Sequence, residues 1–549
     1  MATILEPPQI ASEIVHPPPS PTVPVPEAAQ PDAIPSVNPW IVAISVMLAT
    51  FMEVLDTSIA SVALPYIAGS LAASNSEATW VLTTYLIANA VVLPASNWFS
   101  LRFGRKRFLL TCVVVFIIAS FFCGAAPTLP MLLLARILQG AGGGALQPTA
   151  QAILLESFPP KKRGAAMAVY GFGVVVAPVL GPTLGGWLTD SYSWRYAFYI
   201  NIPVGALAIY MISRFVHDPP YIKHAKAGPF DNLGFALLCL WTACLQIVLD
   251  KGQEVDWFSS AWLRWAVAIL IVSFLWFIRH SWRSHSPLVD LRVITRHWNF
   301  GVSCILIFLL GFILYLQVAM LPLFYQEILG YTALTAGIIV APRGLGSMLG
   351  LPIVGVLTQK FDNRYLLFAG FVVFSLCSLA FSFVNLSIGP YTLLIPIVAT
   401  GFAMSFLFVP IGNMGTNSVS NVEMGNATGI FNLLRNIGGS IGIAVASTAL
   451  VRRTAFHQAR LVDRMHPSDP QLQQHVRSFT GYFGMHFGRA NGHAGALASI
   501  YRMMEQQALL MSFTEIFYGC AIVAGVAAIV GWTFRKMPPH PPDPKRAMH

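Results

Sequence analysis

Long apolar runs alternate with short polar breaks along almost the whole chain. Four of these runs contain no charged residue: 108–135, 165–189, 301–326 and 365–422. A helix that crosses a bilayer needs about 20 apolar residues, whereas a transmembrane β-barrel shows short alternating segments. The pattern therefore predicts an all-α polytopic membrane protein. We expect fourteen transmembrane helices, near residues 40–64, 79–99, 108–126, 130–155, 164–187, 196–216, 229–249, 260–280, 299–325, 335–357, 364–385, 390–414, 426–450 and 507–534.

Composition agrees with this class. Of the 549 residues, 55% are hydrophobic and only 10% are charged, whereas soluble domains carry about 25% charged residues. The seven cysteines all fall in predicted spans and indicate neither a disulfide framework nor a metal site. The sequence contains no nucleotide-binding loop, catalytic-serine elbow or haem motif. We therefore expect no enzyme activity, no cofactor and no metal.

The distribution of basic residues predicts the orientation in the membrane. The net charge of +10 is spread over short loops, so it does not indicate nucleic acid binding. Most Lys and Arg residues follow helices 2, 4, 6, 8 and 10 or lie in the C-terminal tail, and this bias places both termini in the cytoplasm. The segment 451–504, with seven Arg and five His, is then an external loop. The Pro-rich residues 1–38 are predicted to be a disordered cytoplasmic tail.

Two acids in the first span carry the candidate chemistry. Asp56 lies at bilayer depth, and Glu53 lies three positions earlier on the same helix face. An intramembrane carboxylate is costly and usually faces a protein interior or a wet cavity. The pair predicts a site that holds a proton or a cation. A buried ion pair with a distant arginine is the alternative interpretation.

The fourth helix supplies a cation. Arg136, Gly140, Gly144 and Pro148 follow one another at i+4 steps and share a face. Arg136 remains protonated, so it can pair with Glu53 or Asp56, either in proton coupling or only to fix helix packing.

A stripe of small residues marks the fifth helix. Gly173, Ala177, Gly181 and Gly185 repeat every four residues. Pro178 and Pro182 are interleaved with them, and Gly186 follows. Such a stripe permits close helix packing, and the prolines remove backbone hydrogen bonds. It indicates either a packing seam or a seal in a transporter that rocks between two states.

A repeated loop indicates two related halves. Asn97–Lys106 after helix 2 lines up with Gly355–Arg364 after helix 10. This predicts a six-helix half at 39–216, two inserted helices at 217–297, a second half at 298–537 and a cytoplasmic tail at 538–549. The first loop carries four residues that either fix topology or form a cytoplasmic latch: Arg102, Gly104, Arg105 and Lys106. Polar residues in the spans are candidates to line a substrate cavity: Gln139, Arg343, Asn432 and Arg435.

Several of these segments together resemble one family. Leu55–Pro65, which includes Asp56, resembles the first-helix motif of the fourteen-helix drug/proton antiporters, the EmrB/QacA type of the major facilitator superfamily. Gly171–Gly186 resembles their antiporter motif, and Trp194–Pro203 and Phe431–Gly439 are similar to further family signatures. The resemblance covers about Pro39 to Met537 and is nearest to the EmrB branch. The loop motif departs from that of the superfamily, because Asn97 and Leu101 stand where the superfamily usually has a Gly and an Asp. A latch therefore needs another acid, such as Glu156, or another mechanism.

The resemblance implies a major-facilitator fold and a function. We expect a proton-coupled antiporter that exports amphipathic small molecules across the bacterial inner membrane by alternating access. It also implies a periplasmic adaptor protein and an outer-membrane channel as partners. The residues leave two alternatives open: a proton-coupled importer or uniporter of a small metabolite, and a membrane subunit of a proton-pumping enzyme complex.

Overall fold

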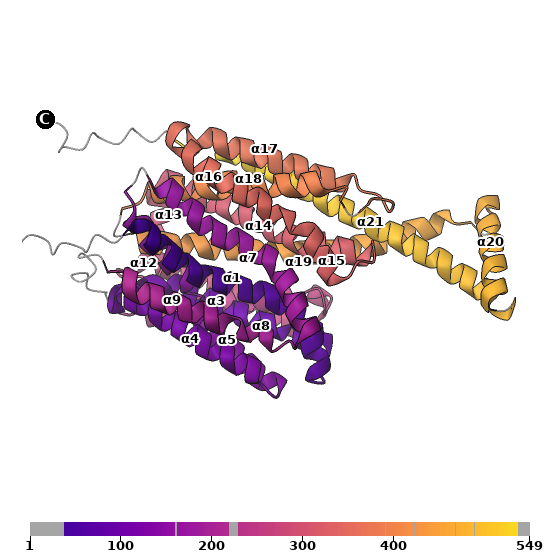
Figure 1. The fold of residues 1–549 in the computed structure, drawn as a ribbon, viewed down its shortest axis with the longest axis horizontal. Coiled ribbons are helices and arrows are strands. Elements are labelled where there is room, and N and C mark those ends of the chain that lie inside the picture. Colours follow the sequence, from indigo (N-terminus) through magenta and orange to yellow (C-terminus); the bar gives the residue numbers. More distant parts are fainter. Residues whose placement is uncertain are drawn as a thin grey trace, which may run out of the picture. The chain divides into compact units, whose positions relative to one another are not determined.

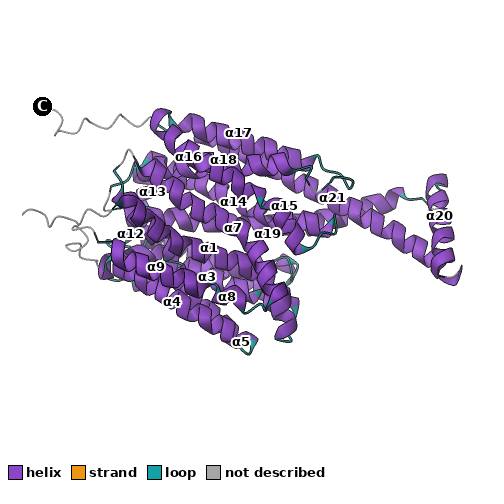
Figure 2. Ribbon diagram, viewed as in Figure 1, coloured by secondary structure: helices purple, strands orange, loops and turns teal. Residues whose placement is uncertain are grey.

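The structure is a computed structural model, and it describes residues 38–159, 162–218, 229–389, 391–420, 423–466, 468–487 and 489–535. All regular elements of this part are helices (Figure 2). The predicted tails at 1–38 and 538–549 lie outside it, apart from Asn38. The prediction of an all-α fold is confirmed.

Each of the fourteen predicted ranges falls mainly on one helix or on two consecutive helices. The ranges 130–155, 196–216 and 335–357 are each divided between two. The first half contains α1 (Pro39–Ser70), α2 (Asn75–Ala78), α3 (Trp80–Phe103), α4 (Arg105–Ala125), α5 (Leu129–Gly143), α6 (Leu146–Ser157), α7 (Arg163–Ser191), α8 (Tyr196–Tyr199) and α9 (Asn201–Phe215). The remainder contains α11 (Asn232–Lys251), η2 (Trp257–Ser259), α12 (Ala261–Arg283), α13 (Arg292–Arg296), α14 (Trp298–Glu327), α15 (Ala333–Val340), α16 (Pro342–Lys360), α17 (Asn363–Ser382), α18 (Leu394–Thr416), α19 (Met424–Arg464), α20 (Pro470–Phe487) and α21 (Arg489–Gly531).

Twelve helices of the described part are long and apolar enough to cross a membrane, and α7 makes a thirteenth when its two bent segments count as one span. The helix at the remaining predicted position is α3. It is absent from that set, and it carries the buried polar residues Thr83, Asn89 and Ser96. Polar side chains of this kind lower its hydropathy, and they face other helices instead of lipid.

The helices pack in the same pattern twice. In the first half, α1 packs on α7, α3 on α5, and α4 on α5 and α9. In the second, α14 packs on α19, α16 on α18, and α17 on α18 and α21. The first three long helices of each half (α1, α3 and α4; α14, α16 and α17) thus pack on corresponding helices. We call α1–α9 the N-terminal half and α14–α21 the C-terminal half; α7 packs on α16 and α3 on α19 between them.

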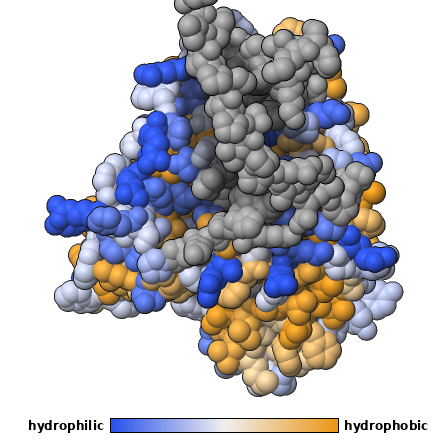
Figure 3. Space-filling view, turned by 90° about the vertical axis from the view of Figure 1, so that its left-hand side faces the viewer, coloured by the Kyte–Doolittle hydropathy of each residue, from blue (hydrophilic) through white to orange (hydrophobic). Residues whose placement is uncertain are grey.

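The two helices inserted between the halves are α11 and α12. α11 packs on α12, α3 and α19. α4 and α5 expose large apolar side chains, including Phe121, Phe122 and Leu138, as expected of helices that face lipid. Figure 3 shows apolar residues gathered at the lower edge of the molecule, at the level of α4 and α5 in Figure 1, with hydrophilic residues directly above them.

The structure differs from the expected loop at 451–504. The segment 451–504 is largely helical, because α19 continues to Arg464 and α20 and the start of α21 follow. These helices project beyond the others (Figure 1); we call residues 451–504 the projection. A turn at Gly144 and Ala145 divides α5 from α6. Arg136, Gly140 and Gly144 nevertheless all contact α3, so the predicted shared face is present.

Candidate transport site

Asp56 lies at the centre of a closed polar network in the N-terminal half. It is 0% exposed and sits in the middle of α1. Arg136 of α5 donates from Nη1 to Asp56 Oδ2 at 2.7 Å, and both side chains are fully buried. The structure therefore pairs Arg136 with Asp56 and not with Glu53.

Neutral side chains complete the shell of Asp56. Gln139 Nε2 donates to Asp56 Oδ1 at 2.9 Å, and Asn201 Nδ2 donates to the same oxygen at 2.6 Å. Both amides also donate to Ser120 Oγ, whose hydroxyl donates to the Phe198 carbonyl. Asp56 thus has one cation and two amide donors, the satisfied state that a buried carboxylate requires.

The Arg136 guanidinium is held from several sides. Its Nε donates to the Val81 carbonyl at 2.9 Å, and its Nη1 also donates to Gln139 Oε1 at 2.7 Å. The ring of Tyr85 lies 4.3 Å from the guanidinium carbon, within the range of a cation–π contact. These contacts hold the cation from α3 and α5, so all of them come from the N-terminal half.

Glu53 has a different environment. Asn89 Nδ2 donates to Glu53 Oε1 at 3.0 Å, Tyr85 donates its hydroxyl to the same atom at 3.3 Å, and Gln147 Nε2 donates to Oε2. All four side chains are buried. Among the described residues Glu53 has neutral donors and no direct ion pair, so the two acids of α1 are not equivalent.

The C-terminal half reaches this second acid through Gln147. The Gln147 amide donates to Glu53 and its Oε1 accepts from Arg435 Nη2 of α19. Nearby, Asn432 Nδ2 of α19 donates to Gln151 Oε1 of α6 at 2.8 Å. Two buried amides of α6 therefore connect the halves at the depth of Glu53.

The small-residue stripe of α7 packs on the helix that carries both acids. A Cβ atom at Gly173 would lie 2.9 Å from the Met47 side chain, and one at Gly185 would lie 3.3 Å from the Ile59 backbone. Gly181 faces Ser58 in the same way. Gly186 is buried on the same helix.

The prolines of α7 are part of this contact. Pro182 has no N–H to bond the Pro178 carbonyl, and Ser58 Oγ of α1 donates to that carbonyl at 3.2 Å. α7 bends by 40° between its segments Ala165–Pro178 and Leu180–Ser191. The stripe is thus a seam between α1 and α7, with the bend at its prolines.

Two acids from other parts of the chain hold the loop between α3 and α4. Gly104 has φ +87°, a conformation that favours glycine, and a Cβ there would lie 2.7 Å from Asp218 Oδ2. Lys106 N donates to Asp218 Oδ1 at 2.8 Å, and Arg105 forms a buried ion pair with Glu156 of α6. Arg102 is exposed. Glu156 thus supplies an acid to this loop, but the pair lies within one half, and a latch between the halves stays a prediction.

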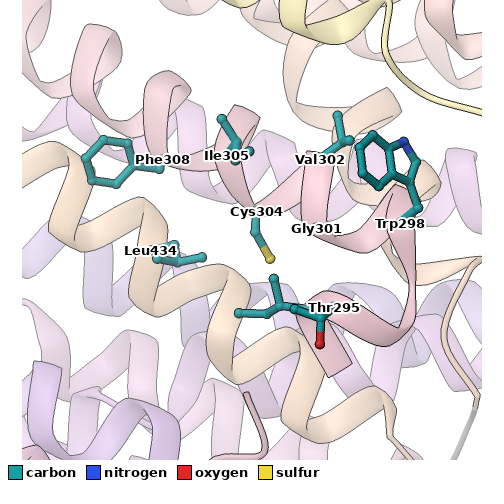
Figure 4. Close-up of a pocket in the computed structure, with 9 residues that line it drawn as sticks. Thr295, Trp298, Gly301, Val302, Cys304, Ile305, Phe308 and Leu434 are labelled. Carbon is teal, nitrogen blue, oxygen red and sulfur yellow. The ribbon is translucent and has the colours of Figure 1, made fainter. Parts of the chain in front are cut away.

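The four residues expected to line one cavity lie in three places. Gln139 belongs to the Asp56 network, Asn432 and Arg435 lie between the halves, and Arg343 contacts Gln317 inside the C-terminal half. Two cavities of the described part are lined by other, mainly apolar residues. One of about 540 Å³ lies among α13, α14 and α19, and includes Trp298, Cys304 and Leu434 (Figure 4).

The second cavity, of about 470 Å³, lies between α7 and α16 and is lined by Ala165, Phe172, Leu351 and other apolar residues. It therefore lies at the contact between the two halves. Neither cavity contains a carboxylate or an arginine.

Sequence reasoning missed five polar residues that the structure brings to the acids: Tyr85, Asn89, Ser120, Gln147 and Asn201. Each is a polar residue in an apolar span, which is the signal that could have indicated it. Their partners could not be read from spacing because they come from other helices.

Comparison with known proteins agrees with this architecture. Residues 46–443 match the family model described as Major Facilitator Superfamily. The chain is 34% identical over 506 residues to the Multidrug export protein EmrB of Haemophilus influenzae, which covers 90% of this chain and 95% of that protein. It is an EmrB-type member of the major facilitator superfamily.

Further similarities fit this membership. The Fatty acid resistance protein FarB of Neisseria gonorrhoeae is 34% identical over 503 residues, 89% of this chain and 95% of that protein. The crystal structure of the human organic anion transporter MFSD10 superposes with a TM-score of 0.56 at 15% identity, covering 89% of this chain and 100% of that one. The second similarity supports the fold alone.

Membership of the superfamily settles the class of protein. The chain is a multi-pass membrane transporter and not an enzyme, so the alternative of a subunit in a proton-pumping enzyme complex is excluded. The expected resemblance to the EmrB-type drug antiporters is confirmed.

Proposed function

We propose that this chain is a proton-coupled multidrug efflux antiporter that exports amphipathic small molecules across a bacterial inner membrane by alternating access. The observation that carries the proposal is the buried pair of Asp56 and Arg136 beside a second buried acid, Glu53, in the helix that packs on the α7 seam. Two protein sequences with which it shares 34% identity are named for multidrug export and fatty acid resistance.

The chemistry of such a transporter needs an intramembrane group that gains and loses a proton. Asp56 and Glu53 are carboxylates in the membrane-spanning part of the first half. Each proton that moves inward down a 100 mV potential supplies about 2.3 kcal/mol. One or two protons for each substrate molecule are enough to drive a useful outward gradient.

The two acids suit two tasks. Asp56 and all its partners belong to the N-terminal half, so this network is able to move as one body. Glu53 is linked through Gln147 to Arg435 of the other half, so its hydrogen bonds must change when the halves separate. We assign proton carriage primarily to Asp56, with Arg136 as its counter-ion, and inter-half coupling to Glu53.

The seam and the loop have mechanical roles in this proposal. The α1–α7 contact at Gly173, Gly181 and Gly185 seals the pathway on one side, and the α7 bend at Pro178 and Pro182 lets its ends move separately. The loop residues Arg102, Gly104, Arg105 and Lys106 brace the cytoplasmic end. Asn432 and Arg435 face the interface between the halves, where a substrate passes.

Both termini are proposed to lie in the cytoplasm, which places the projection in the periplasm. An ion pair of Arg453 with Glu515 and a contact of 3.1 Å between His457 Nε2 and the same carboxylate hold its base together. It exposes apolar side chains, including Tyr482 and Met485, beyond the other helices (Figure 1). We propose that this surface binds a periplasmic adaptor protein connected to an outer-membrane channel.

The function is tested in proteoliposomes that contain the purified protein, with the same concentration of a fluorescent dye inside and outside at the start. An imposed proton gradient should drive dye transport against its concentration gradient, and collapse of the gradient by a protonophore should stop it. Uptake in the direction of the proton flux would instead support the importer alternative.

A further inference from the structure

The C-terminal half holds a buried cation without a carboxylate partner. Arg343, near the start of α16, is 3% exposed. Its Nη2 donates to Gln317 Oε1 at 2.7 Å, and its Nη1 has no hydrogen-bond partner among the described residues. None of the ion pairs in the described part includes Arg343.

The groups around Arg343 are neutral. Gln317 Nε2 of α14 donates to Ser378 Oγ of α17 at 2.8 Å. The Cys520 sulfur of α21 lies 3.8 Å from both Gln317 Nε2 and Ser378 Oγ. All three side chains are buried and lie on different helices.

This cluster is the counterpart of the Asp56 network. The repeated loops start at Asn97 and Gly355, 258 positions apart. The same spacing places Ser378 at the position of Ser120 and Arg343 at that of Tyr85. Ser120 belongs to the Asp56 network, and Tyr85 is the ring that lies against the Arg136 guanidinium.

The remaining members correspond by helix. Asp56 comes from α1 and Gln317 from α14, the first helix of each half; Asn201 comes from α9 and Cys520 from α21, the last helix of each half. Both clusters therefore contain a guanidinium, a serine from the third helix and a polar group from the first. The difference is charge, because the N-terminal cluster has a carboxylate and the C-terminal cluster has an amide.

A buried guanidinium without a counter-charge is costly, because the interior solvates it far less well than water does. We propose that Arg343 anchors an anion site in the C-terminal half, which takes up one monovalent anion at the Nη1 that lacks a partner among the described residues. The shared chemistry is one negative charge with lone pairs that accept from Nη1, and its source is either a chloride ion or the carboxylate of an organic acid. The site goes beyond the proposed function, which requires no anion.

The test is the thermal unfolding of the purified full-length protein in detergent. Chloride is titrated against sulfate, a larger divalent anion, at constant ionic strength, and octanoate is titrated separately as the organic carboxylate. We expect a saturable rise in the unfolding temperature of about 2 °C or more with one of them. The same rise should be absent in Arg343→Gln. A response to chloride identifies an inorganic anion, and a response to octanoate alone identifies an organic carboxylate.

A second variant keeps the test decisive if Arg343→Gln does not fold. Gln317→Glu supplies a carboxylate from the chain itself, so it should remain folded and lose the anion response. Asp56→Asn removes the corresponding carboxylate from the other half, and it should gain an anion response in addition to that of Arg343. The proposal is overturned if wild-type protein shows no saturable response to either anion, or if Gln317→Glu responds as wild type does.

Discussion

Glu53 and Arg435 belong to different halves of the protein and share one side chain, the amide of Gln147. The amide donates to the Glu53 carboxylate and accepts from the Arg435 guanidinium. Because the amide has a donor and an acceptor end, this orientation serves a carboxylate on one side and a cation on the other. A change of charge on Glu53 therefore alters the hydrogen bonds of Gln147, which join the two halves.

The Asp56–Arg136 pair is arranged differently, because both residues and their other partners lie in the N-terminal half. Opening of the interface leaves this pair in place, whereas it must break the Gln147 bridge. In the proposed mechanism, proton exchange at the first site and the bridge at the second are coupled through α1, which carries both acids.

Asp56→Asn should abolish proton-driven efflux while substrate binding survives. The amide keeps the shape of the carboxylate but cannot carry a proton, and it leaves Arg136 as a buried cation without its counter-ion. Removal of one partner of a buried ion pair typically costs about 3–5 kcal/mol. Efflux in proteoliposomes and unfolding temperature measure the two effects.

The double variant Asp56→Asn with Arg136→Gln is the control for stability. It should regain much of the lost stability, because neither position of the pair then carries a charge, and it should still not pump. Normal efflux by Asp56→Asn under an imposed pH gradient would contradict the assignment of the proton to this residue.

Glu53→Gln should be milder than Asp56→Asn. All direct partners of Glu53 are neutral, so the change leaves no buried charge in direct contact with the site. We expect the rate of proton-driven efflux to fall about five- to tenfold, as a modest coupling energy implies. Gln147→Leu should lower the efflux rate to a similar extent, because it removes the side chain that joins Glu53 to Arg435.

Gln246→Leu is the matched control for the bridge. Gln246 donates to Ser440 Oγ at 3.0 Å and links α11 to α19 away from the acids. Its loss should change efflux little. Equal losses in Gln147→Leu and Gln246→Leu would show that the bridge has no special part in coupling.

Gly181→Leu should abolish or uncouple transport in protein that inserts normally. Ser58 of α1 occupies the space that a side chain at Gly181 needs, so α1 and α7 would be forced apart. Gly519→Leu is the control, because nothing lies within 4 Å of a Cβ at that position. Wild-type transport by Gly181→Leu would make the seam incidental to function.

Reporter fusions test the proposed orientation. Fusions after Arg102 and after Ser284 should read cytoplasmic, and a fusion in the projection near Pro470 should read periplasmic. The basis is the excess of Lys and Arg on the predicted inner side. An internal reading near Pro470 would overturn the placement of the projection and with it the proposed adaptor surface.

The sequence by itself determined the class, the fold and the acids. Apolar runs of bilayer length permit only helices, since backbone groups in lipid must bond within their own segment. The cost of a carboxylate at bilayer depth made Asp56 and Glu53 stand out before any contact was known. The repeated loop at Asn97 and Gly355 predicted related halves, and the packing pattern repeats as expected.

Only the tertiary structure decided which groups meet. Spacing along one helix could not tell whether Arg136 pairs with Asp56 or Glu53, because that depends on how α5 lies against α1. The projection was missed because its polar, charged helices lack the apolar runs by which membrane spans are recognised. The Gln147 bridge and the Arg343 cluster could not be predicted from the sequence either. Their members come from separate helices and become neighbours only when the helices pack.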